Sequence, residues 1–151
     1  MTKVLFAAAL CAVTAFAQPN FSGEWKLDIA RSDFGQIPAP EVLTRSIKHQ
    51  EPSLDYITYQ KGRQGEVTSE IKYTTDGKPC VNKVQDKEAK GTARWVGENL
   101  LIEYTIDLGS VQVSAKEIWT LGDGGKTLTI SNHISIPQQG EYDRKLVLDK
   151  Q

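Results

Sequence analysis

The feature that most restricts the fold of this chain is an alternation of apolar and polar residues with a period of two. Beyond residue 17, one short stretch after another places apolar side chains at every second position, as in Leu100, Ile102, Tyr104 and Ile106. This period is typical of strands that bury one face, whereas an amphipathic helix repeats every 3.6 residues. Val, Ile, Thr and aromatic residues are frequent in the same region and alanine is scarce. The sequence therefore predicts an all-β chain.

Turn signals between these stretches predict how the strands connect. Asp76-Gly77, Gly97–Asn99 and Gly122–Gly125 each separate two alternating stretches, and Asp-Gly pairs are typical of tight hairpin turns. Strands this close in sequence form a meander, and a meander has no exposed edges if it closes into a barrel. We predict one antiparallel up-and-down β-barrel domain of about 8–10 strands over residues 18–151. The irregular segment Asp28–Glu41 is expected to cross one end of this barrel.

The first 17 residues have the organisation of a secretory signal peptide. Lys3 precedes an uncharged apolar run, Val4–Val13, and Ala15-Phe16-Ala17 matches the small-x-small pattern that precedes a cleavage site. The apolar run is shorter than the ~20 residues with which a helix crosses a bilayer. The sequence therefore predicts cleavage after Ala17, and a secreted or periplasmic domain with no membrane span.

Charge and cysteine content narrow the possible partners. The chain has 18 Lys and Arg against 19 Asp and Glu, a formal net charge of −1. Such a balance provides no long-range field toward nucleic acid or an anionic membrane, so we expect neither as a partner. Cys80 is the only cysteine beyond residue 17, which leaves a hydrophobic core to hold the domain without an internal disulfide. We expect a monomer.

No motif of a catalytic, metal or cofactor site stands out. The sequence lacks the Gly-x-Ser-x-Gly nucleophile pattern, and the glycines at 122–125 precede a strand rather than the helix of a phosphate-binding loop. His49 and His133 are not at metal-ligand spacing, and we expect both at the solvated surface. We assign no catalytic residue, no metal and no cofactor. An enzymatic activity is less favoured but stays open.

Several polar or amphipathic residues fall on strand faces that we expect to point into the barrel. Buried polar groups need hydrogen-bond partners, so these residues imply an internal network, trapped water or a bound polar group. Barrels of eight or more strands are wide enough to hold a small ligand. The candidate lumen residues are Tyr56, Tyr73, Tyr104, Glu117, Trp119, Asn132 and Tyr142.

Two functions are compatible with this interior. One is an exported noncatalytic binding protein that holds a small apolar or amphipathic molecule in the barrel lumen. The other is a structural or protein-interaction module, in which the same polar residues satisfy one another in a filled core. The volume of the lumen is the property that separates them.

The segment FSGEWKL at residues 21–27 contains the pattern Gly23-x-Trp25, and Arg144 lies late in the last predicted strand. Together they resemble the signature of lipocalins and related fatty-acid-binding barrels, the calycin group. The resemblance implies that Trp25 packs across one end of the barrel against Arg144 through cation–π and packing contacts. The chain departs from secreted lipocalins in lacking their disulfides, and from cytosolic fatty-acid carriers in lacking an obvious helical lid. It is also similar to small exported bacterial proteins that begin with FSG-x-W-K-L.

Overall fold

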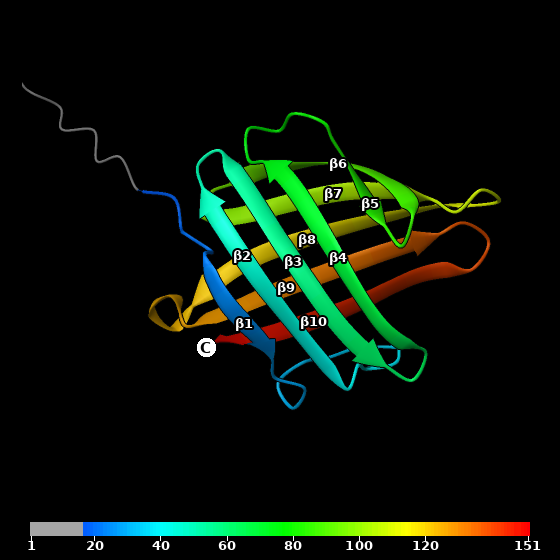
Figure 1. The fold of residues 1–151 in the computed structure, drawn as a ribbon, viewed down its shortest axis with the longest axis horizontal. Helices are drawn as coiled ribbons and strands as arrows, with labels where there is room; N and C mark the ends of the chain where they lie inside the picture. Colours follow the sequence, from blue (N-terminus) through cyan, green and yellow to red (C-terminus); the bar gives the residue numbers. More distant parts are fainter. Residues whose placement is uncertain (1–16) are drawn as a thin grey trace, which may run out of the picture.

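The computed structural model describes residues 17–151, which form ten antiparallel strands (Figure 1). Short turns join most of them, and one 3₁₀ turn, η1 (Asp123–Gly125), lies between the eighth and ninth strands. The strands are β1 (Gly23–Leu27), β2 (Val42–Gln50), β3 (Ser53–Gly62), β4 (Gly65–Thr74), β5 (Cys80–Val84), β6 (Lys87–Val96), β7 (Asn99–Asp107), β8 (Gln112–Gly122), β9 (Thr127–Ile136) and β10 (Gly140–Lys150).

All ten strands belong to one sheet, in the order β4-β3-β2-β1-β10-β9-β8-β7-β6-β5. The first strand pairs with β2 on one side and with the last strand, β10, on the other. In Figure 1, β2, β3 and β4 run diagonally in front of β6–β10, so that the sheet wraps around its own inner face. The prediction of an antiparallel up-and-down barrel is confirmed.

The barrel wall has one seam, between β4 and β5. These strands are the two edges of the sheet, and they lie beside each other with no backbone ladder between them in the residues described. The Asn82 side chain joins them instead. Its Oδ1 accepts a hydrogen bond from the backbone N–H of Lys72 (2.8 Å), and its Nδ2 donates to the Lys72 carbonyl (3.0 Å). The barrel is therefore nearly closed.

The prediction of a tight hairpin at Asp76-Gly77 is wrong. Thr75 donates its N–H to the Pro52 carbonyl and Gly77 donates to the Ala93 carbonyl, both at bond lengths near 2.9 Å. Asp76 also forms an isolated bridge with Arg94 on β6. The residues after β4 therefore turn away toward neighbouring elements, which explains why β4 and β5 do not continue as a ladder.

The two ends of the barrel differ in how well their inward side chains are covered. At one end, the side chains of Phe21, Leu54, Leu100, Leu128 and Leu148 are completely buried. At the opposite end several inward residues keep part of their surface exposed. These residues are Val67, Ile106, Val113, Ile134, Ile136 and Tyr142. We call the two regions the filled end and the open end.

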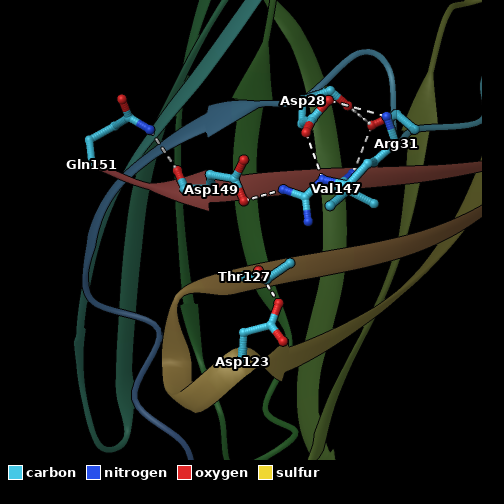
Figure 2. Close-up of polar contacts among 8 residues, drawn as sticks. Asp28, Arg31, Asp123, Thr127, Val147, Asp149 and Gln151 are labelled. Carbon is cyan, nitrogen blue, oxygen red and sulfur yellow. Dashed lines mark hydrogen bonds and ion pairs between the residues drawn. The ribbon is translucent and has the colours of Figure 1, made fainter.

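The segment Asp28–Glu41 passes the open end, as predicted from its composition. Asp33 forms an isolated bridge with Lys145 on β10, and Glu41 donates its N–H to the Lys61 carbonyl on β3. Arg31 contacts the carboxylates of Asp28 and Asp149 and thereby ties the start of the segment to β10 (Figure 2). The segment thus begins beside the C-terminal part of β10 and reaches the open end at residues 37–40.

The predicted signal peptide covers residues 1–17, and only Ala17 of it belongs to the described residues. Within residues 17–151 no helix has the length and apolar character that a membrane crossing requires.

Candidate ligand site in the barrel interior

Trp25 closes the filled end of the barrel, but with a different cation from the predicted one. The strand register places Trp25 opposite Lys150, and the Lys150 Nζ lies 5.6 Å from the centroid of the indole ring. Arg144 lies in the middle of β10, opposite Asn132 on β9. Because β1 has only five residues and pairs with the last residues of β10, Arg144 lies beyond its reach. The predicted contact between Trp25 and Arg144 is therefore corrected to one between Trp25 and Lys150.

His49 is buried at the filled end, so its predicted position at the solvated surface is wrong. Only 5% of the residue is exposed, and its ring stacks on Phe21 and lies near Trp95. The His49 Nδ1 accepts a hydrogen bond from the backbone N–H of Phe21 (3.2 Å). The proton of the neutral ring is consequently on Nε2, which donates to Glu51 (2.8 Å). His133, by contrast, lies half-exposed on the outer face beside Asp143, in agreement with the prediction.

Glu51 holds the filled end together through three donors. Besides His49, its carboxylate accepts hydrogen bonds from the Thr75 hydroxyl (2.5 Å) and from the Trp95 indole N–H (2.9 Å). Burial disfavours the charged carboxylate, but the bonds from Thr75, His49 and Trp95 together outweigh it and hold the pKa of Glu51 below its ordinary value of 4.5. The carboxylate thus stabilises the folded state.

We expect Glu51→Gln to lower the free energy of unfolding by about 1 kcal/mol at pH 7, because charge-assisted hydrogen bonds become neutral ones and the half-exposed site is screened by water. The folded-state pKa is depressed, so this contribution is present above the unfolded pKa and is lost as the pH falls through the folded value. Urea unfolding from pH 7 to pH 3 should show the two proteins converging at acidic pH. Glu88→Gln, at an exposed pair with Lys90, is the matched control and should change little.

The middle of the barrel contains a belt of connected polar side chains. Glu117 on β8 accepts hydrogen bonds from Trp119 Nε1 (2.8 Å), Asn132 Nδ2 (3.3 Å) and the Tyr104 hydroxyl (3.5 Å). Asn132 Oδ1 accepts in turn from Arg144 Nε (3.1 Å). Alternation along β7, β8, β9 and β10 brings all five side chains to the inner face, as the sequence predicted and as the register now explains.

Arg45 on β2 is the central residue that the sequence analysis missed. Its guanidinium carbon lies 4.8 Å from the ring centroid of Tyr56 and 5.1 Å from that of Trp119, and its Nε donates to the Thr58 hydroxyl (2.9 Å). Arg45 is only 7% exposed, and its buried Nη1 has no hydrogen-bond partner among the residues described. The signal was present in the sequence, because Arg45 alternates in phase with the apolar residues Leu43 and Ile47.

The remaining predicted lumen residues fall into two groups. Tyr56 and Tyr73 are buried, and Tyr56 lies against the Trp119 ring with centroids 5.1 Å apart. Burial, followed by the charge of Glu117, raises the pKa of Tyr56, Tyr73 and Tyr104. Tyr142 does not join this group, because it lies at the open end and its hydroxyl donates to the Gln139 carbonyl (3.3 Å).

The charges of the belt do not cancel. Arg45 and Glu117 are buried, and Arg144 is half-buried beside Asn132, so two arginines face one carboxylate in the interior. A charge held away from water is stable only with a partner, and the excess here is positive. Within residues 17–151 no cluster of His, Cys, Asp and Glu has the arrangement of a metal site. The belt is therefore suited to binding a polar or anionic group rather than a cation.

A pocket of about 410 Å³ opens at the mouth, between the segment 37–40 and the β3–β4 hairpin. Its walls include Ile37, Pro38 and Pro40 on one side, and Gln60 and Val67 on the other. Gln60 and Val67 face each other across β3 and β4 on the inward phase, so the pocket reaches the inner face of the barrel. This volume lies in the range of small-molecule sites.

No protein-family model and no curated protein matches the sequence. Among solved structures, the fold is similar to a zebrafish ileal bile acid-binding protein complexed with cholic acid, with a TM-score of 0.58 and 17% identity over 87% of this chain and 98% of that one. The REP1-NXSQ fatty acid transporter gives a TM-score of 0.58 and 15% identity over 87% and 96% of the two chains.

Secretory abundant heat soluble protein 4 from Ramazzottius varieornatus gives a TM-score of 0.55 at 13% identity, covering 87% of this chain and 94% of that one. Identities at this level establish a shared fold and nothing more. Together with the strand order and the pairing of first and last strands, these matches identify the fold as a calycin-like, nearly closed β-barrel.

Proposed function

We propose that this chain is an exported, noncatalytic binding protein that holds a small apolar or amphipathic molecule in the open half of the barrel. The observation that carries this proposal is the buried Arg45 guanidinium, whose Nη1 lacks a hydrogen-bond partner. Leaving a buried donor unpaired is costly, and an arginine retained at such a position has a use that packing alone does not supply. A bound ligand whose polar group reaches the belt would provide the missing acceptor for the Arg45 Nη1.

The shape of the interior supports the same arrangement. The partly exposed residues Ile106, Val113, Ile134 and Ile136 offer an apolar wall above the belt, and the mouth pocket opens on the inward faces of β3 and β4. An amphipathic molecule would place its apolar part along this wall and its polar group below. The similar barrels named for bile acid binding and fatty acid transport hold guests of this kind, which favours the proposal by analogy of fold.

The second candidate is a structural or protein-interaction module without a ligand. The filled end favours it, since one continuous hydrophobic cluster extends from Phe21 and Trp25 to Leu146 and Leu148. A barrel stabilised in this way needs no guest for its stability. The two candidates differ in what they predict for the open half alone.

Native mass spectrometry of the protein purified from its own host tests the proposal most directly. We expect a retained small molecule, and we expect saturable one-site binding of the fluorescent anion 1-anilinonaphthalene-8-sulfonate to the emptied protein. The intact mass should also lack residues 1–17 if the chain is exported. A protein that retains no molecule and binds the fluorophore only weakly and without saturation would favour the module instead.

A further inference from the structure

The seam between β4 and β5 is the weakest join in the barrel wall. Every other pair of neighbouring strands shares a backbone ladder, with register pairs running along most of the shorter strand. At the seam, the polar contacts among the described residues are the two hydrogen bonds between the Asn82 side chain and the Lys72 backbone, and a longer contact between the Thr74 hydroxyl and the Cys80 Sγ. Opening the seam therefore breaks no backbone ladder, whereas even the shortest of the other joins, between β1 and β10, has three register pairs.

The surroundings of the seam show a thin wall between solvent and the interior. On the outside, Val81 is 62% exposed, and a pocket of about 330 Å³ is bordered by Lys72, Val81 and Lys83. On the inside, the buried side chains of Ile71 and Tyr73 on β4 belong to the same cluster as the interior. Asn82 itself is buried, so its amide fills the space that a ladder would otherwise occupy.

We propose that the barrel opens at the β4–β5 seam, and that Asn82 is the latch that sets how fast the lumen exchanges its ligand. The exchange role rests on the proposed function, whereas the opening does not. Local openings occur where the fewest buried contacts and backbone bonds must break. The mouth is the competing route, since the segment 37–40 covers the pocket there.

Cys80 provides a ligand-independent probe of the opening. It begins β5, its Sγ lies 3.6 Å from the Lys78 carbonyl and 4.0 Å from the Thr74 hydroxyl, and it packs against the interior cluster. It is also the only cysteine beyond residue 17. We expect Asn82→Ala to speed its reaction with a maleimide about tenfold under native conditions, because loss of two hydrogen bonds shifts the opening equilibrium by about that factor.

Asn99→Ala is the matched control for this substitution. Asn99 also accepts a cross-strand side-chain bond, from the Thr120 hydroxyl (2.9 Å), but between strands that have a full ladder. Its labelling rate should stay within about twofold of the wild-type rate. Asn82→Asp keeps the acceptor for the Lys72 N–H but sets a carboxylate oxygen against the Lys72 carbonyl, so it too should speed the labelling should Asn82→Ala not fold. Equal labelling in the Asn82 and Asn99 variants would overturn the proposal that Asn82 is the latch.

Stopped-flow binding of 1-anilinonaphthalene-8-sulfonate tests the exchange role. Asn82→Ala should raise its association and dissociation rates together by about tenfold and leave its Kd unchanged, since a latch acts on access rather than on the site. Pro38→Gly at the mouth should change neither rate. If Pro38→Gly changes the association and dissociation rates and Asn82→Ala does not, the seam is not the route by which the ligand enters. If the fluorophore does not bind at all, the proposed function fails, while Cys80 labelling still decides whether the seam opens.

Discussion

Replacing Trp119 by alanine is expected to lower the free energy of unfolding by about 3–5 kcal/mol, the range found when large aromatic residues are removed from protein cores. Trp119 is completely buried, and its ring meets Phe21 edge-on with centroids 5.6 Å apart and lies against Tyr56. Its Nε1 also donates to Glu117. The substitution therefore leaves a cavity and removes a donor from a buried carboxylate at the same time.

Guanidinium chloride unfolding followed by circular dichroism measures this effect, and Trp95→Ala is its matched control. Trp95 stacks on Phe21 and donates to Glu51, but it remains partly exposed at the barrel end. Water fills the space left by Trp95, so its removal should cost less than half as much as that of Trp119. Equal losses at the two positions would contradict the expectation that the difference in burial between the two tryptophans decides the cost.

The faces of the strands were predictable from the sequence, because alternation alone decides which side chains share a face. Tyr56, Glu117 and Asn132 were assigned to the interior in this way, and all three are buried there. Their polar character identified them as candidate site residues, since polar residues on a buried strand face need hydrogen-bond partners. Arg45 meets the same criterion, because it is a charged residue in phase with Leu43 and Ile47.

The positions of residues along the barrel axis were not predictable from the sequence. A period of two repeats about every 7 Å along a strand, so it leaves the register between the first and last strands undetermined. Trp25 and Arg144 were placed on the correct face, yet the pairing sets Lys150 opposite Trp25. The register depends on where β1 ends and where the segment 28–41 begins, which local patterns do not determine.

Contacts made by loops were also not predictable from the sequence. His49 falls among polar neighbours, but the backbone N–H of Phe21 and the carboxylate of Glu51 complete its hydrogen bonds and allow it to be buried. Asp76-Gly77 has the composition of a tight turn, but hydrogen bonds to Pro52 and Ala93 draw the chain elsewhere. In both cases distant parts of the chain outweigh the local preference.

Arg45→Met is expected to raise the free energy of unfolding by about 1–3 kcal/mol and, at the same time, to weaken the binding of 1-anilinonaphthalene-8-sulfonate at least about tenfold. Methionine keeps the unbranched shape between the rings of Tyr56 and Trp119 without burying a guanidinium whose Nη1 is unpaired. The binding loss follows because the belt then holds one arginine against Glu117 and no longer has an excess positive charge.

Arg144→Met separates this effect from the general loss of an interior arginine. Arg144 donates to Asn132, so its removal leaves an acceptor unpaired and should lower stability rather than raise it. Denaturant unfolding and fluorescence titration of both variants measure the two quantities on the same samples. If Arg45→Met is destabilising and binds the fluorophore as well as the wild type, Arg45 is held by its ring contacts as part of the core, and the filled-module interpretation is favoured. If Arg45→Met raises stability and weakens binding while Arg144→Met lowers stability, Arg45 is kept for a ligand at the expense of stability.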